Sequence, residues 1–179
     1  MSLLWGISGR ISVLARVSNV TEAVAAAAAG ASLLDVGDDD ELIPAIRDAA
    51  RDVPIIGRGA GAGITRDAAL AARAGAGLIC PDPDAAARAV RRGITAERIL
   101  VATAPAGIPA AVRSGWAVLV DVDEGADSPA EAEAVAAVCA WLGASVIRTR
   151  YVAGVRRCVD MTESILGRRP PAWALRGLA

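Results

Sequence analysis

The hydrophobic positions of this chain fall into short continuous runs, and each run follows a helix-like stretch rich in Ala and Arg. A Gly or a short polar break separates the two, and a charged or polar residue closes the apolar run. The copies are AAAAAGASLLDVGD, AARDVPIIGRG, AARAGAGLICPD, RRGITAERILVAT, AVRSGWAVLVDVD and CAWLGASVIRTR, at residues 25–38, 49–59, 71–82, 91–103, 111–123 and 139–150. This alternation is typical of parallel βα units whose strands are buried on both faces.

The pattern predicts about seven parallel strands with helices in the gaps, at a spacing of about 20 to 27 residues. The expected strands are Ser12–Arg16, Leu33–Val36, Pro54–Arg58, Leu78–Cys80, Ile99–Ala102, Ala117–Val122 and Val146–Arg150. The expected helix N-caps are Thr21, Thr65, Asp84 and Ser128. No interdomain linker is visible, so we expect one domain over residues 1–179. Residues 3–10 are expected to add a short strand or hairpin, and residues 166–179 an extended C-terminal tail that packs or dangles.

Composition narrows the class of protein. The chain of 179 residues is 54% hydrophobic but only 3% aromatic, with no Phe, so its core must consist of small aliphatic side chains. The net charge of −1 and the lack of a one-sided basic run argue against nucleic-acid binding. No apolar stretch approaches the ~20 residues of a membrane span, and no basic leader precedes the short apolar run at the N-terminus. We therefore expect a cytoplasmic protein without a membrane partner.

Residue types that are missing exclude several kinds of chemistry. The chain has no His, and its 19 basic residues are all Arg. A His general base, a Ser-His-Asp triad and a Lys Schiff base are therefore excluded. Cys80, Cys139 and Cys158 are scattered and fit neither a disulfide framework nor a metal site, so we interpret them as buried apolar residues. Arg, carboxylates and backbone amides remain, and Arg holds phosphates and carboxylates well.

Candidate site residues follow the predicted strands, because the carboxyl ends of parallel strands carry the chemistry in such folds. Arg16, Arg58, Arg148 and Arg150 end three strands. Alternation puts Arg148 and Arg150 on one side, and barrel closure would bring Arg16 beside them to hold an anion. The open alternative is that these arginines pair with neighbouring carboxylates.

Two further patterns have more than one interpretation. Gly59, Gly61 and Gly63 join a strand to a helix, where glycine amides can cradle a phosphate, although the pattern favours a flexible connection. Asp35, Asp82, Asp121 and Asp123 follow other strands. Two of these carboxylates can share acid–base work or bind Mg²⁺, or they can simply cap helices. No other cofactor is indicated.

One segment resembles a known family. GASVIRTRYVAGVRRCVDMTESI, residues 143–165, is similar to the last strand and helix of dihydropteroate synthase, which typically contains G-A-x-I-x-R-x-H-D-V. Residues 23–37 resemble that family's second unit, which ends in D-[IV]-G, and residues 93–102 resemble its G-I-x-x-x-x-I-x-x-D stretch. The resemblance implies a pterin-binding TIM barrel of folate biosynthesis, a transferase in which the arginine matching Arg148 lies beside the pterin and the diphosphate.

The sequence also departs from that family at its functional positions. The first loop, N-V-T-P-D-S-F, is reduced to Asn19–Thr21, and the S-R-K motif is replaced by Asp121–Asp123. The third-strand Asp position falls near Gly57–Arg58, and Arg150 stands where the family has His. The fourth-strand Asn and the Asp of D-P-G fall near Cys80–Pro81 and Ala102–Thr103. The chain is shorter than a typical barrel by roughly 70 residues, and we expect one unit to be missing near Gly93–Pro105.

These observations predict a reduced barrel with an altered pterin pocket. Such a protein would bind a small anionic or heterocyclic ligand, pterin-like or phosphate-bearing, or act as a non-catalytic partner subunit. The predicted ligand-binding residues are Arg16, Asp35, Arg58, Asp121, Arg148 and Arg150. An active dihydropteroate synthase-type transferase is one alternative, and an unrelated phosphate-binding barrel enzyme that uses Arg58, the glycine loop and an Asp base is another. Incomplete closure would expose strand edges, which favours a homo-oligomer or a hetero-partner.

Overall fold

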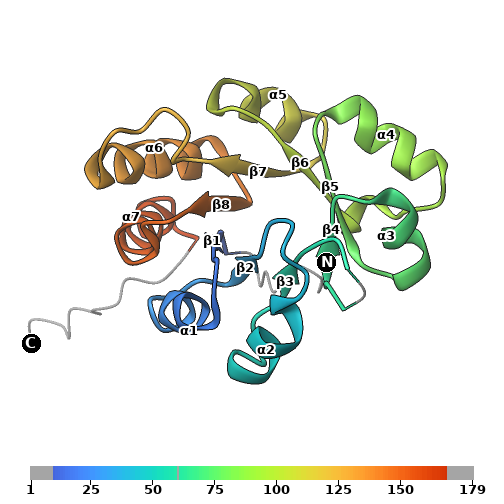
Figure 1. The fold of residues 1–179 in the computed structure, drawn as a ribbon. Helices are drawn as coiled ribbons and strands as arrows, with labels where there is room; N and C mark the ends of the chain where they lie inside the picture. The colour runs from blue at the N-terminus through green and yellow to red at the C-terminus, as the bar shows by residue number, and fades with distance from the viewer. Residues whose placement is uncertain (1–9, 60, 169–179) are drawn as a thin grey trace, which may run out of the picture.

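The strands close into a single parallel barrel inside a ring of helices (Figure 1). The computed structural model describes residues 10–59 and 61–168. The strands follow one another around the barrel in chain order: β1 Ser12–Arg16, β2 Leu33–Asp35, β3 Ile55–Ile56, β4 Ile64–Thr65, β5 Gly77–Cys80, β6 Ile99–Ala102, β7 Ala117–Asp121 and β8 Val146–Thr149. This confirms the predicted α/β, TIM-barrel-like fold, with eight strands where the sequence predicted about seven. Residues 3–9 of the expected hairpin and residues 169–179 of the expected tail lie outside the described residues.

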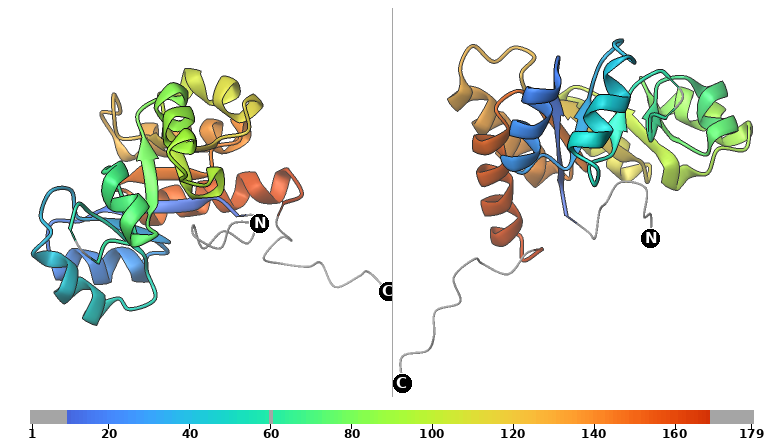
Figure 2. Two further views of the ribbon diagram at one scale, coloured as in Figure 1. Left: turned by 90° about the vertical axis from the view of Figure 1, so that its right-hand side faces the viewer. Right: turned by 60° about the horizontal axis from the view of Figure 1, so that its bottom comes forward.

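The helices lie outside the strands, as two further views also show (Figure 2). They are α1 Val20–Ala28, α2 Leu42–Ala49, α3 Ala68–Ala74, α4 Pro83–Arg91, α5 Ile108–Arg113, α6 Pro129–Leu142 and α7 Val152–Ile165. The predicted cap at Ser128 is confirmed, since its hydroxyl accepts the Glu131 N–H at 3.3 Å. The predicted caps at Thr21, Thr65 and Asp84 are wrong. An Asn or Asp two residues away caps each of these helices instead, at Asn19, Asp67 and Asp82, because its side-chain oxygen reaches the free N–H groups of the first turn.

Among the described residues, no helix is long and apolar enough to cross a membrane.

The strand that the sequence did not predict is β4, and it is joined to β3 without a helix. Parallel neighbours normally need a crossover of about a dozen residues. Here β3 and β4 have two residues each, so the chain has to travel back by only ~7 Å before it pairs Ile64 with Ile56. The glycine-rich residues 57–59 and 61–63 make this return. The unit expected to be missing near Gly93–Pro105 is complete, with α4, β6 and α5 in place, so that prediction was wrong.

Strand alternation separates two kinds of core. Apolar side chains that point into the barrel form one layer: Leu14, Leu33, Ile56, Ile64, Ile79, Leu100, Leu119 and Val146. The alternate residues point outward and pack under the helices, mostly against Ala, Val and Ile. The barrel interior is therefore filled with side chains.

Pairing between β8 and β1 closes the barrel, with Val13 beside Ile147 and Leu14 beside Arg148. The expectation of incomplete closure was therefore wrong, and each strand of the described residues has a partner on both sides. The closed barrel leaves no exposed strand edge among the described residues to favour self-association. A homo-oligomer or a hetero-partner therefore stays a prediction that strand edges do not support. The closure does confirm that the last strand lies beside the first.

Candidate site at the carboxyl ends of the strands

Four charged side chains form the layer directly above the apolar interior. Leu14, Leu33, Leu119 and Val146 point into the barrel, so the residues two positions later must do the same. These are Arg16, Asp35, Asp121 and Arg148. The strand register sets Arg16 beside Asp35 and Asp121 beside Arg148. The sequence predicted all four as ligand-binding residues, and the structure brings them together at the barrel mouth.

Asp35 is the most buried member of this layer, with 1% of its side chain exposed. Its Oδ2 lies 2.8 Å from Arg66 Nη2 and 3.3 Å from Arg148 Nη1, and its Oδ1 accepts the Gly37 N–H at 2.9 Å. Burial by itself would raise the pKa of Asp35. The hydrogen bond and charge of Arg66, the Gly37 N–H and the charge of Arg148 outweigh burial and hold that pKa below its ordinary value. Asp35 is therefore a fixed anion between two arginines.

Arg148 links this pair to the opposite side of the mouth. Its Nε and Nη2 lie 2.9 and 2.8 Å from Asp121 Oδ2, while its Nη1 faces Asp35. Arg16 adds a longer contact to the same Asp121 oxygen at 3.9 Å and keeps 62% of its side chain exposed. We call the set Arg66, Asp35, Arg148 and Asp121 the mouth ion-pair chain. Arg148 is paired with the carboxylates of Asp35 and Asp121, whereas the largely exposed Arg16 is available to bind a ligand.

Arg150 leaves the barrel interior because β8 ends at Thr149. Its backbone N–H donates to Asp123 Oδ2 at 2.6 Å, and its guanidinium lies over the Tyr151 ring, 5.1 Å from the centroid. Its Nε is 3.7 Å from Asp123, and 60% of the side chain is exposed. The hydroxyl of Thr149 fixes Asp123 from below at 2.7 Å. Arg150 is thus positioned at the rim, beside Arg148 but outside the mouth ion-pair chain.

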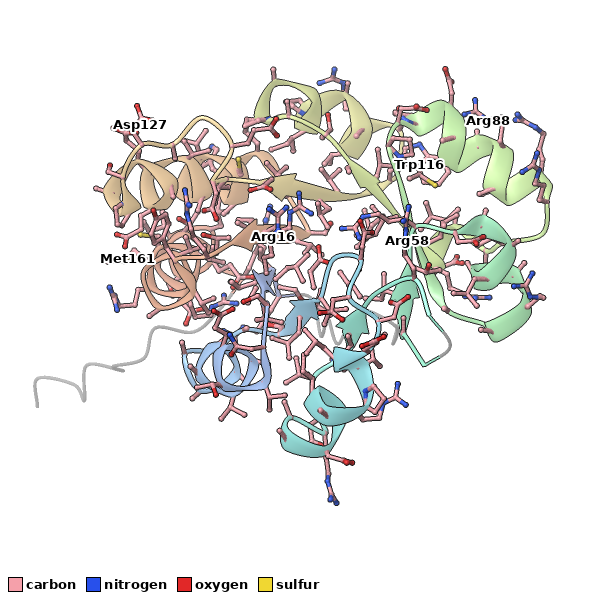
Figure 3. The ribbon with its side chains drawn as sticks, in the orientation of Figure 1. Arg16, Arg58, Arg88, Trp116, Asp127 and Met161 are labelled. Carbon is pink, nitrogen blue, oxygen red and sulfur yellow. The ribbon has the colours of Figure 1, made fainter. Side chains whose placement is uncertain are left out.

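Arg58 and the glycine loop lie on the other side of the barrel. Arg58 is 63% exposed and pairs with Asp38 at 3.2 Å, and its backbone N–H donates to Asp40 Oδ1 at 2.7 Å. A Cβ at Gly59 would lie 3.0 Å from the Asp40 carboxylate, so the loop wraps closely around Asp40. Figure 3 shows Arg58 apart from Arg16. The carboxylate of Asp40 thus occupies the position in this loop where a bound anion would lie. Phosphate binding by Gly59, Gly61 and Gly63 stays a prediction.

A cavity of about 600 Å³ opens at the mouth over β1, β7 and β8. Its walls are charged: Arg16, Arg148 and Arg150 face Glu22, Asp121, Asp123 and Glu124, with Ser18 at the edge. Among the described residues, no group of three or more carboxylates or cysteines is arranged to hold a metal ion. The cavity has the size of a small-molecule site, and it offers both guanidinium donors and carboxylate acceptors.

The sequence missed Arg66, although this arginine makes the shortest contact to Asp35. Arg66 follows β4, which is too short to stand out as an apolar run. The sequence pattern predicts Thr65 as a helix cap, so it does not mark Arg66 as the end of a strand. The signal that would have found it is the pair Ile64–Thr65 after a glycine run, where a buried β-branched pair is followed by a cation.

Comparison with solved structures finds the same fold. No protein-family model matches the chain, and no curated protein matches its sequence. Among solved structures, Mycobacterium tuberculosis Rv1207 matches with a TM-score of 0.75 and 28% identity, over 92% of this chain and 95% of that one. Dihydropteroate synthase from Yersinia pestis matches with 0.73 and 18%, over 89% and 94%. The Xanthomonas albilineans synthase with 4-aminobenzoic acid matches with 0.74 and 17%, over 88% and 94%. The chain is therefore a short barrel with the dihydropteroate synthase type of fold.

Proposed function

We propose that this chain binds a small anionic or heterocyclic ligand at the barrel mouth, in a pocket altered from that of the dihydropteroate synthases. The observation that carries the proposal is the mouth ion-pair chain. Arg66, Asp35, Arg148 and Asp121 bridge the mouth from β4 to β7, directly above the apolar layer. A ligand therefore meets the charged cavity at the rim rather than a deep open barrel.

The exposed arginines supply the recognition chemistry. Arg16 and Arg150 keep about three-fifths of their side chains exposed and line the cavity together. A guanidinium carries five N–H donors in a fixed fork, which suits a carboxylate or a phosphate. Glu124, at the same rim, can accept from the amino or ring N–H groups of a heterocycle. Solved structures with this fold hold 4-aminobenzoic acid, 7,8-dihydropteroate and pteroic acid, which supports a ligand of related chemistry.

The free-energy cost of binding an anion depends on which carboxylates it must displace from the arginines. An anion that approached Arg148 would have to displace Asp121 or Asp35, and a buried carboxylate without its partner costs several kcal/mol. Arg16 has a single long carboxylate contact among the described residues, so it can turn to a ligand at little cost. We therefore assign the main anion contact to Arg16, with Arg150 as the second.

The test is calorimetric titration with a pterin diphosphate, pteroate, 4-aminobenzoate and inorganic diphosphate. Arg16→Ala is expected to weaken binding of the responding anions about tenfold or more, since a charge-assisted hydrogen bond contributes about 1.5–3 kcal/mol. Arg88→Ala is the matched control, because Arg88 is an exposed arginine on α4, far from the mouth (Figure 3). Absence of binding to all four probes, or equal affinity in Arg16→Ala, would overturn the proposal.

The same samples separate binding from catalysis. A transferase of the dihydropteroate synthase type would form dihydropteroate when pterin diphosphate and 4-aminobenzoate are mixed with the protein. We expect no product above the buffer rate, because the S-R-K and final His positions of that family hold Asp121–Asp123 and Arg150. Product formation would show that the pocket remains catalytic. Light scattering of the purified chain tests whether it forms a homo-oligomer.

A further inference from the structure

A second cavity of about 610 Å³ adjoins the first one and has a different character. The two cavities share Arg16, Glu22 and Arg150. Beyond these residues the second cavity runs over the outer side of the barrel, between α1 and the start of α7. The three shared residues therefore form a divide, with the charged mouth on one side and the second cavity on the other.

Small apolar residues leave this space open. The wall from α1 consists of Ala25, Ala26 and Ala29, and the wall from α7 consists of Val152, Ala153 and Gly154. Near its C-terminal end, the α1 side approaches α7 closely, with the Gly30 position packed on Arg156. Towards the strand ends, by contrast, alanine side chains leave the gap between the two helices open, and Tyr151, Pro129 and Glu133 complete its lining. The result is a trough with apolar sides rather than a polar cleft.

The charges at the divide determine which head group fits. Arg16 and Arg150 present exposed guanidinium groups to the trough's open end. Glu22 lies beside them, with its carboxylate held by the Ser18 N–H and hydroxyl at 2.8 and 2.9 Å. At the other end, the carboxylate of Glu133 lies close against Gly154. The two arginines and the two glutamates of the lining give it a formal net charge of zero. A ligand with one negative charge therefore suits the divide better than a diphosphate, which carries more negative charge.

We propose that the trough binds the apolar body of a small amphiphilic carboxylate whose head group lies on Arg16 and Arg150. The carboxylate takes the planar fork of the guanidinium groups, and the hydrocarbon part lies between the alanines of α1 and Val152. The proposal rests on the proposed function in one respect, since Arg16 is the anion contact of both cavities. It adds a ligand class and a site outside the barrel mouth.

The test is calorimetric titration with butanoate, hexanoate and octanoate. If the chain of the ligand enters the trough, affinity rises about three- to fourfold for each added CH₂. Ala25→Leu fills the trough and is expected to remove this dependence on chain length while leaving diphosphate binding at the mouth unchanged. Ala28→Leu is the matched control, since Ala28 is exposed on the same helix but does not line the trough. Arg16→Ala is expected to weaken octanoate binding about tenfold.

The outcomes separate the two proposals. Equal affinities for butanoate and octanoate, or an equal loss in Ala25→Leu and Ala28→Leu, would overturn the trough. Octanoate binding that Arg16→Ala does not change would overturn the carboxylate anchor. Absence of binding by pterin diphosphate, pteroate, 4-aminobenzoate and diphosphate, with the chain-length dependence intact, would overturn the proposed function at the mouth and leave the trough standing.

Discussion

At the scale of single residues, the charge state of Asp35 depends on partners from two other strands. Arg66 follows β4 and Arg148 lies on β8, and both reach the same carboxylate oxygen. Since Asp35 is almost fully buried, its charge is tolerable only while these partners remain. The same contacts that shape the candidate site therefore also contribute to the stability of the fold.

Asp35→Asn is expected to lower the free energy of unfolding by about 3 kcal/mol at pH 7, because the neutral amide loses both charged partners. Urea titration measures the change. Because the folded-state pKa of Asp35 is lowered, its contribution is complete above the unfolded pKa of about 4 and is lost as pH falls through the folded value. The difference in unfolding free energy between wild type and Asp35→Asn should therefore begin to narrow as pH falls below about 4.

Asp38→Asn is the control for this measurement. Asp38 also pairs with an arginine, at 3.2 Å from Arg58, but 82% of its side chain is exposed. An exposed pair contributes about 0–1 kcal/mol, so little change is expected at any pH. If both variants lost equal stability, or if the gap for Asp35→Asn did not narrow at all as pH fell below about 4, burial of the Asp35 charge would not be the cause.

At the scale of elements, α7 is fastened to the start of β1 by a buried carboxylate. Glu163 is fully buried, accepts the Ile11 N–H at 2.7 Å and pairs with Arg156 Nη2 at 3.4 Å. Arg156 also donates to the Ile11 carbonyl at 2.8 Å. These contacts fix the final helix against the strand that closes the barrel, at the end opposite to the candidate site.

Glu163→Ala is expected to cost about 1–3 kcal/mol of unfolding free energy, since it leaves the Ile11 N–H without an acceptor and removes one carboxylate partner of Arg156, which keeps Asp160 and the Ile11 carbonyl. Glu163→Gln keeps an acceptor for Ile11 and should cost less. Glu41→Ala is the control, because Glu41 is exposed and makes no cap hydrogen bond at the start of α2. A Glu163→Ala protein as stable as Glu41→Ala in urea would contradict the fastening role.

At the scale of the whole molecule, the rates at which the cysteines are alkylated measure how closely the outer core is packed. Cys139 lies on α6 and is fully buried, and burial raises the pKa of its thiol to about 11. Cys80 is also buried, whereas Cys158 on α7 is partly exposed. Because the thiolate is the reactive form, accessibility and pKa together set the rate of alkylation.

In the folded protein at pH 8, Cys158 is expected to react with iodoacetamide first, and Cys139 at least a hundredfold more slowly, since its pKa of about 11 leaves little thiolate. Mass spectrometry after timed labelling measures each site. In urea the three rates should converge, which serves as the control. Equal rates for Cys139 and Cys158 without denaturant would show that the α6 side of the core opens readily.

The sequence predicted much of the fold because its signals are local. Each long apolar run became a strand within one or two residues, and Ser128 caps α6 as expected. The sequence does not predict the two-residue strand β4, because this strand is stabilised by pairing with neighbours on both sides and has no apolar run of its own. Because the pattern does not mark β4, the sequence predicts a missing unit near Gly93–Pro105, which is wrong, and does not identify Arg66 as a site residue.

What the sequence by itself determined is the set of parallel units, their order and the charged residues that end them, since apolar runs and strand alternation act over a few residues. Only the tertiary structure decided how those ends combine. Asp35 meets Arg148 because β8 closes onto β1, and it meets Arg66 because a short return replaces a helix after β3. These partners are far apart along the chain, and their contacts depend on the register of strands that do not adjoin in sequence.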